Sequence, residues 1–205
     1  MLIQGAVGQL TTTSMAPGTN PTFRQGQMGE LIVSELQGRY YENAYRQNLF
    51  WAANQAAQAV SVALATTYTG ICLSNPAGNT KNLVPLKLQY ALSVAPAAIA
   101  TLGIITGYAS TGVTVHTTAL TPASTLIGTG PAPTAKADSA ATLVGTPAWS
   151  MQFSSGFTAA ALPSTGATVI DLEGVFIIPP GGYLALGALT AVTGLGAIVW
   201  AEVPV

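Results

Sequence analysis

Hydrophobic and polar residues alternate along much of this chain, which is typical of strands with one buried face. Residues 83–94 show the pattern most clearly, because every second position from 86 to 92 is large and apolar: Leu86, Leu88, Tyr90 and Leu92. Pro85 has no amide hydrogen to donate, so we expect this strand to start at a sheet edge or a bulge. An apolar run at 69–74 predicts a preceding strand, and NPAGNTKN at 75–82 predicts a hairpin turn between them.

Further short segments are rich in valine, isoleucine, threonine or aromatic residues and are bounded by glycine, proline or serine: IATLGIITGYAS, VTVHTTAL, PAWSMQFSSGF and ATVIDLEGVFIIP. Together with the other strands, about eight such segments predict a mainly β protein, an antiparallel two-sheet sandwich with Greek-key links. Residues 121–148 are rich in proline, alanine and threonine and predict one long loop. Loops of this length are uncommon unless they bind something or extend over a neighbouring molecule.

The stretch between Glu173 and Glu202 carries no charged residue, which raises the possibility of a membrane span. Residues 184–201 approach the roughly 20 apolar residues that a spanning helix needs. Glycine and threonine interrupt this run every few positions, however, and no lysine or arginine flanks it. The same region fits short strands, separated by a Pro-Pro-Gly-Gly turn and a Thr-Gly loop, at 175–178, 183–189 and 197–200. We therefore predict buried strands and no membrane partner.

The first 60 residues differ in kind from the rest. Glu35 with Arg39, and Glu42 with Arg46, stand four residues apart, which favours a short helix. NLFWAANQ, which follows, fits an extended segment instead. We predict an N-terminal arm and lead-in segment of extended or partly helical structure over residues 1–60, followed by a β-sandwich domain over residues 61–205.

Charge is scarce in this chain, and the scarcity bears on its partners. Asp, Glu, Lys and Arg make up 6% of the 205 residues, against about 25% in an average globular domain. A free monomer with so few charges is poorly protected against self-association, so we expect other protein to cover much of its surface. The net charge of −1 offers no basic footprint for nucleic acid. A secretory signal is not predicted, because the N-terminal residues lack a basic segment followed by a sustained apolar one.

The residues that could carry chemistry are few. His116 is the only histidine and Cys72 the only cysteine, so a Ser-His-Asp or Cys-His arrangement could use only His116 as its base. We interpret His116 as a polar residue on a strand face and Cys72 as a small buried hydrophobic residue. Asp171 and Glu173 are two apart on a predicted strand, which suggests a solvated face or an intersubunit salt bridge, with a calcium site as the alternative. We predict no enzyme, metal or cofactor.

Aromatic residues gather near the end of the lead-in segment, in GRYYENAYRQNLFW. Such rings stack on nucleic-acid bases in some proteins, but the nearby arginines are balanced by Glu35 and Glu42. Tyrosine, tryptophan and arginine are also the residue types enriched at protein contacts. We therefore predict a subunit interface formed by Tyr40, Tyr41, Tyr45, Arg46, Phe50 and Trp51.

Three stretches together carry a resemblance to a known family: GELIVSELQGRYYENAYRQNLFWAANQAAQAVSVALATTYTGICLSNPAGNTKNLVPLKL, FIIPPGGYLALGAL and AIVWAEVPV. The combination resembles a family of tailed-bacteriophage virion proteins that are encoded among head and tail structural genes. The similarity runs from about Gly29 to Val205 and rests on structural turns. It implies a jelly-roll-like β-sandwich, which phages use for capsid decoration (cement) proteins and for fibre and spike heads.

From these observations we predict a structural virion protein, a capsid decoration (cement) protein on the phage head surface that binds the major capsid protein and stabilises the shell. The expected assembly is a homo-oligomer, preferably a homotrimer, with no nucleic acid, membrane or small-molecule substrate. One alternative is an adaptor protein of the tail, fibre or spike. Another is a carbohydrate-binding module or sugar-acting enzyme, which would require Asp171, Glu173 and His116 to meet in one cleft with aromatic walls.

Overall fold

The computed structural model describes residues 5–6, 23–24, 38–62, 64–112, 115–157 and 167–205. The chain divides into two compact units, Met1–Tyr41 and Glu42–Val205. In the first unit, β1 (Gly5–Ala6) pairs in parallel with β2 (Phe23–Arg24). Glu35, which the helix prediction used, lies outside the described residues. The short helix α1 (Tyr41–Tyr45) stands at the division between the two units.

The second unit is an antiparallel β-sandwich, as the sequence predicts. Sheet I consists, in order across the sheet, of β11 (Ala148–Phe157), β7 (Ala100–Tyr108), β13 (Gly182–Ala188), β5 (Thr67–Ser74), β10 (Lys136–Thr142) and β8 (Val115–Ala119). Sheet II consists of β12 (Thr168–Asp171), β6 (Lys81–Val94), β14 (Val192–Pro204), β3 (Leu49–Ala53) and β9 (Ala123–Ser124), with β4 (Gln58–Val60) paired to β14. The jelly-roll connectivity itself stays a prediction.

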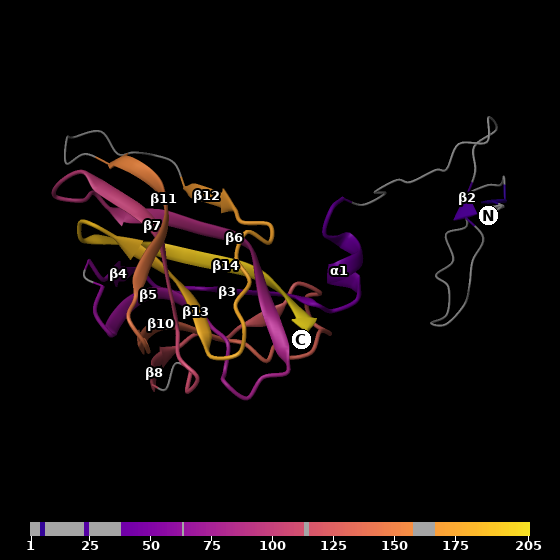
Figure 1. The fold of residues 1–205 in the computed structure, drawn as a ribbon. Helices are drawn as coiled ribbons and strands as arrows, with labels where there is room; N and C mark the ends of the chain where they lie inside the picture. The colour runs from indigo at the N-terminus through magenta and orange to yellow at the C-terminus, as the bar shows by residue number, and fades with distance from the viewer. Residues whose placement is uncertain (1–4, 7–22, 25–37, 63, 113–114, 158–166) are drawn as a thin grey trace. The chain divides into compact units, whose positions relative to one another are not determined.

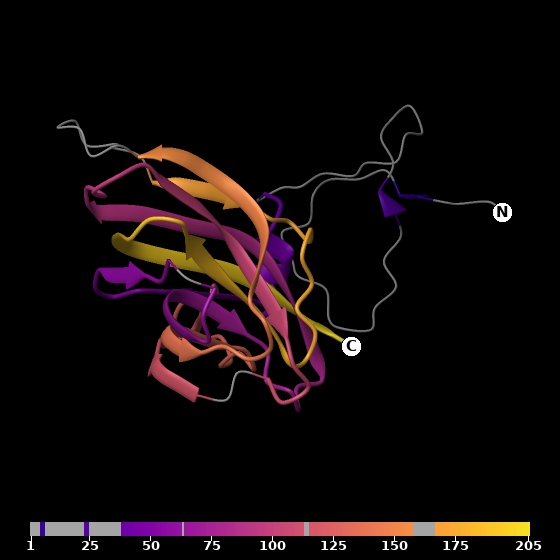
Figure 2. The ribbon, with the colours of Figure 1, turned by 60° about the vertical axis from the view of Figure 1, so that its left-hand side comes forward.

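The edge strands of the two sheets lie in pairs at the two edges of the sandwich. Strands β11 and β12 lie at one edge of the sandwich, and β8 with β9 at the other (Figures 1 and 2). The chain passes from β5 in sheet I to β6 in sheet II and back to β7 in sheet I, and it crosses again around β12 and β13. NPAGNTKN therefore links two sheets, and the hairpin turn predicted there is wrong.

A large apolar core fills the space between the sheets, because each strand turns every second side chain inward. Leu88 and Tyr90 of β6, Leu184 of β13 and Trp200 of β14 belong to this core. The ring centroids of Trp200 and Phe50 lie 6.1 Å apart. Burial of such residues supplies most of the favourable free energy of a sandwich of this kind.

The predicted irregularity at Pro85 is confirmed as a bulge. The pairing of β6 with β14 shifts register there, since Val199 is opposite Lys87 but Trp200 is opposite Pro85. The extra residue is Leu86, which is buried but does not belong to the central core that contains Leu88. The bulge therefore interrupts the single apolar face that the alternation predicted.

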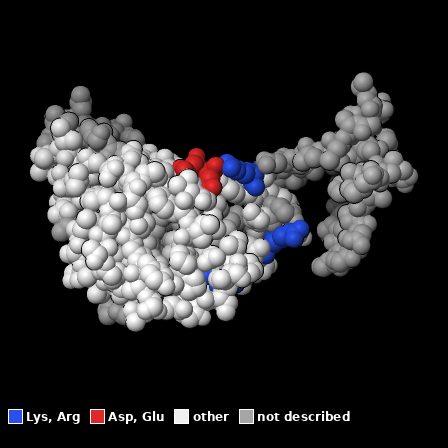
Figure 3. Space-filling model, in the orientation of Figure 1, with Lys and Arg blue, Asp and Glu red and all other residues white. Residues whose placement is uncertain are grey.

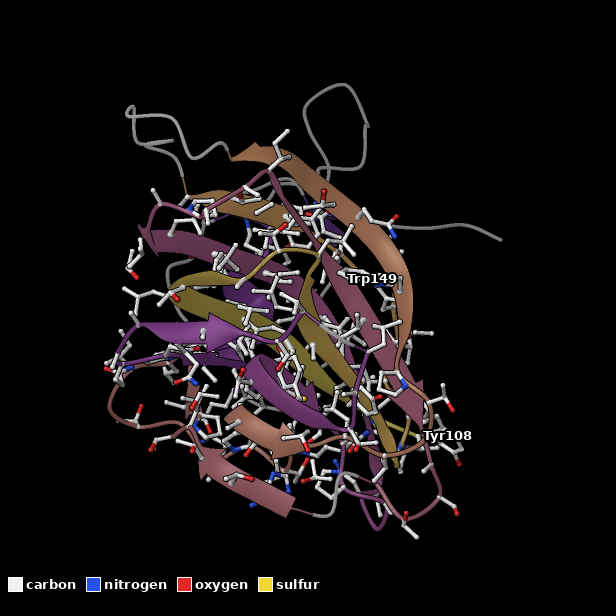
Figure 4. All side chains as sticks on the ribbon, turned by 90° about the vertical axis from the view of Figure 1, so that its left-hand side faces the viewer. Tyr108 and Trp149 are labelled. Atoms are coloured by element: carbon white, nitrogen blue, oxygen red, sulfur yellow. The ribbon has the colours of Figure 1, made fainter. Side chains whose placement is uncertain are left out.

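A second apolar cluster covers the outer face of sheet I. Its buried members are Tyr68, Cys72, Ile105, Ala141, Leu143, Tyr183 and Ala185, with Val144 and Trp149 packed against them. The indole of Trp149 lies directly on the backbone, because a Cβ at Gly103 or Gly187 would approach it to 2.8 or 2.7 Å. Figure 4 looks onto the side of the molecule that carries Trp149 and Tyr108. Sheet I is thus covered on both faces by the chain's own residues.

Three predicted elements differ from the structure. Residues 175–178 form no strand, and only Ile178 makes a β-bridge, to Leu83. The Thr-Gly pair at 193–194 lies inside β14, and the turn comes earlier, at 189–191. The long loop predicted at 121–148 contains β9 and β10. Its alanine-rich and serine-rich composition hid β10, because these residues carry little strand preference.

The predicted domain boundary at residues 60 and 61 also differs from the structure. The compact unit that contains the sandwich begins at Glu42, and β3 pairs with the centre of β14, from Ala197 to Ala201. The extended reading of NLFWAANQ is correct, but this segment is a sheet strand of the sandwich rather than part of an arm.

Candidate binding surface

The outer face of sheet II is largely apolar and partly exposed. Since Ala52, Leu88 and Ile198 point into the core, the residues between them on the same strands point outward. Strand pairing then places the outward residues in rows, which we call the neutral face: Trp51, Ala53, Lys87, Gln89, Ala91, Val169, Asp171, Leu195, Ala197 and Val199. Val169 is 51% exposed and Leu195 is 44% exposed.

The neutral face carries one ion pair. The Lys87 ammonium and the Asp171 carboxylate lie 2.9 Å apart near the β12 edge, and strand pairing sets them side by side. The two charges compensate each other, so the face presents no net charge to a partner. On the side of the molecule drawn in Figure 3, charged side chains occupy a few separate places and most of the surface of the described residues carries none.

Other large apolar side chains are also exposed in the described part of the chain. Ile127 is 89% exposed, Val175 is 72% exposed and Ile177 is 61% exposed. Isolated exposed hydrophobic residues are normal, whereas a contiguous apolar sheet face marks a site of interaction with another molecule. The neutral face is therefore the strongest candidate for a protein contact.

The predicted interface cluster does not form one surface. Tyr41 is 47% exposed and Tyr45 is 55% exposed, Arg46 is exposed, and Tyr40 is partly buried beneath the Arg39 guanidinium at 5.7 Å. Phe50 is 1% exposed and packs inside the core, so its assignment to an interface is wrong. Trp51 points the opposite way because it is the next residue on the strand, and it lies on the neutral face.

The single histidine forms a pair with a buried carboxylate. Pairing of β8 with β10 brings His116 Nδ1 to 2.7 Å from Asp138 Oδ2, and the Asp138 side chain is fully buried while that of His116 is 30% exposed. The other oxygen, Oδ1, has no hydrogen-bond partner. Burial raises the pKa of Asp138, and the hydrogen bond and charge of His116, with Lys136, only partly oppose this.

Asp138 was missed by sequence reasoning because it lies within the predicted loop. The available signal was the alternation KADS, in which Lys136 and Asp138 point to the same side of a strand. The predicted strand position of His116 is confirmed.

The remaining chemical candidates do not gather into a catalytic site. Asp171 is on β12, at the sandwich edge opposite to the β8 strand of His116. Glu173 lies in a turn with a φ of 42°, so it does not continue the alternation that begins at Asp171. Cys72 is buried as predicted, and burial, with the charge of Asp138, raises the pKa of its thiol. Within the described ranges, no group of three or more potential metal ligands occurs.

A buried carboxylate near the C-terminus anchors the segment between β9 and β10. Glu202 accepts hydrogen bonds from the backbone N–H groups of Thr134 and Ala135 at 2.7 and 2.9 Å, and from the Thr134 hydroxyl at 2.7 Å. Lys81 Nζ lies 3.0 Å from the same carboxylate. Burial by itself raises the pKa of Glu202, but these donors outweigh it and hold the pKa below the ordinary value.

The crossover between β5 and β6 is fixed in a similar way by Asn75, which is fully buried. Its amide nitrogen donates to the carbonyl groups of Lys81 and Ile178 at 2.8 and 2.9 Å. Its side-chain oxygen accepts from Asn79 at 2.6 Å. Polar side chains of the chain itself therefore hold the loops at this end of the sandwich.

No protein-family model, curated protein or solved structure matches this chain. Among the described residues, no helix is long and apolar enough to cross a membrane. The uncharged C-terminal stretch forms β13 and β14, so the strands predicted at 183–189 and 197–200 are confirmed, whereas the one at 175–178 is not.

Proposed function

We propose that this chain is a structural subunit of a tailed-bacteriophage particle, a capsid decoration protein that binds the head surface and stabilises the shell. The observation that carries the proposal is the difference between the two outer sheet faces. Sheet I is covered by Leu143, Val144 and Trp149 of the same chain, whereas the neutral face of sheet II is exposed. A chain with 6% charged residues and an open apolar face is suited to permanent contact with other subunits.

The neutral face is the proposed contact with a neighbouring copy of the chain. Leu195 and Val199 lie on the central strand β14, where they are surrounded by the outward residues of β6 and β3. Lys87 and Asp171 neutralise each other, so burial of the face leaves no charge without a partner. A ring of three subunits would use this face on one copy and a different surface on the next.

The energy of such contacts favours a repeated assembly. An interface that buries about 800 Å² on each partner gives a gross hydrophobic driving force on the order of 20 kcal/mol per partner surface. Lost translational and side-chain freedom offsets most of this gain. Linking several copies to one shell makes later contacts effectively intramolecular, so weak individual contacts suffice for stable attachment.

The major capsid protein is the proposed second partner. Exposed apolar side chains outside the neutral face, such as Val175 and Ile177, are available to it within the sandwich unit. The N-terminal arm is the other proposed attachment. Deleting residues 1–28 should therefore weaken binding to empty capsids, and unchanged affinity would remove the arm from the proposal.

The copy number of the chain in purified particles tests the function. Quantitative mass spectrometry with isotope-labelled peptides gives the ratio of this chain to the major capsid protein. Hundreds of copies per particle are expected for a decoration protein. A dozen or fewer would assign the chain to the tail, fibre or spike, and its absence from particles would refute a virion role.

A further inference from the structure

A hollow of about 340 Å³ adjoins the neutral face beyond β3. Pairing of β9 with β3 sets Ala123 beside Trp51, and both residues line the hollow. The rest of its wall comes from residues between 122 and 132, and we call residues 125–132 the edge loop. Since Trp51 also belongs to the neutral face, the hollow and the neutral face form one continuous surface.

The edge loop holds a large apolar side chain out in solvent. Ile127 is 89% exposed, which is the highest value for a large apolar residue in the described part of the chain. No residue from 122 to 135 carries a charge. A single exposed isoleucine is ordinary, but this one stands beside the neutral face and enlarges its apolar surface.

Hydrogen bonds within the chain fix the position of the edge loop. At its start, the backbone N–H and the hydroxyl group of Thr125 both donate to the carbonyl oxygen of Leu49, at 3.0 and 3.2 Å. Just after its end, Glu202 accepts from the backbone N–H groups of Thr134 and Ala135. A partner that contacts the loop therefore has little conformational entropy to remove from it.

The neutral face by itself is small for a subunit contact. Its four strands lie about 4.8 Å apart and its rows span about six residues, which gives a projected area of about 400 Å². A stable interface covers about 800 Å² of each partner, so the contact has to continue beyond these rows. At the β12 edge, the Lys87–Asp171 ion pair bounds the apolar area. At the opposite edge, the uncharged surface continues over Ala123 and the edge loop.

We propose that the contact between subunits continues from the neutral face onto the edge loop, and that a second copy of this chain covers Ile127 and the hollow. This inference rests on the proposed function, because it takes the neutral face to be the contact between copies. The lack of charge supports the same occupant. The edge loop offers no compensation to a charged group that is buried against it, and a second copy, with 6% charged residues, brings few such groups.

Sedimentation equilibrium of full-length variants tests the inference. Ile127→Asp should raise the concentration at which half of the chains are assembled by at least about tenfold, because it removes the burial of one isoleucine side chain. It also places an unpaired charge in the contact. The matched control is Ile99→Asp, which makes the same change at a residue that is 61% exposed, in the turn before β7 of sheet I. This control should assemble like the wild type.

Thiol labelling gives a second readout that does not require the contact to break. Ile127→Cys should react with DTNB more slowly at concentrations where the chains assemble than at concentrations where they are dissociated. Ile99→Cys should react at the same rate under both conditions. Cys72 is fully buried, so it does not obscure the labelling of either variant.

The outcomes separate this inference from the proposed function. A wild type that never assembles would overturn both. Dissociation by Leu195→Glu, with assembly and labelling that do not depend on residue 127, would overturn only the role of the edge loop. If Ile127→Asp assembles normally but no longer binds empty capsids, the major capsid protein covers the loop, and the inference is wrong.

Discussion

Glu202 offers the sharpest test of the stabilising interactions described above. The variant Glu202→Gln keeps the shape of the side chain but replaces one acceptor oxygen with an amide group and removes the charge. In the wild type, three donors from Thr134 and Ala135 point at this carboxylate. The amide of the variant would place its own N–H groups against some of these donors, which leaves buried polar groups unsatisfied.

The size of the effect follows from those bonds. Hydrogen bonds to a charged group contribute about 1.5–3 kcal/mol each, but bonds within one network do not add, so we expect a total loss of about 2–4 kcal/mol in the free energy of unfolding. Lys81 contributes little to this figure because its side chain is 36% exposed and solvent screens the pair. A loss of this size lowers Tm by about 5–15 °C for a chain of this length.

The pH dependence gives a second signature. Because the pKa of Glu202 in the folded state lies below its ordinary value, its contribution to stability is present above the unfolded-state pKa and is lost as the pH falls through the folded-state pKa. The stability gap between wild type and Glu202→Gln should therefore be widest near neutral pH and shrink on acidification. Urea unfolding at a series of pH values measures it.

Asp171→Asn is the matched control, since Asp171 also pairs with a lysine but its side chain is 55% exposed. Exposed pairs contribute about 0–1 kcal/mol, so this variant should unfold almost like the wild type. Equal losses of unfolding free energy in the two variants, or a change below about 0.5 kcal/mol for Glu202→Gln, would show that the buried Glu202 carboxylate does not stabilise the fold more than an exposed ion pair does.

Three further predictions concern single residues. Gly103→Ala should cost about 1–3 kcal/mol, because the new methyl group meets the backbone carbonyl oxygen of Met151 and the Trp149 ring. Gly78→Ala, with open space around it, should change the unfolding free energy by less than about 0.5 kcal/mol; urea melts of both variants check this. The raised folded-state pKa of Asp138 favours folding at low pH, and this contribution to stability is lost as the pH rises through that pKa. Asp138→Asn should therefore gain stability relative to the wild type as the pH rises over this range. Thermal melts at a series of pH values measure the difference, and the opposite trend would refute the prediction. Cys72, which is fully buried, should react with a thiol reagent such as DTNB only under denaturing conditions, and rapid labelling of the native protein would contradict the packing.

The alternation of apolar residues predicted β6 and β13 well because both strands lie inside a sheet with neighbours on each side. It failed at 175–178, where Val175 and Ile177 are apolar but exposed. A sequence pattern identifies residues that can form a strand but not whether a partner strand lies beside them. It failed in the opposite direction at β10, because alanine and serine carry little strand preference, although β10 pairs with β5 and β8 on its two sides.

The candidate sites were harder to predict than the strands. Trp51 stands out in the sequence, but the neutral face depends on the register that aligns β3, β14, β6 and β12, which no short stretch contains. Phe50 and Trp51 are neighbours in the sequence and were predicted to share one interface. Consecutive residues of a strand point to opposite faces of the sheet, so the two side chains are separated.

The molar mass of the full chain in solution tests the central claim most directly, namely that neighbouring subunits cover the neutral face. Sedimentation equilibrium of the wild type should give an oligomer, with a trimer at three times the 20.7 kDa of one chain. Leu195→Glu should dissociate it, because the new charge lies on the neutral face, while Leu189→Glu, at an exposed turn position after β13, should not. A wild type that stays at 20.7 kDa at every concentration, or an oligomer that Leu195→Glu leaves intact, would contradict the account.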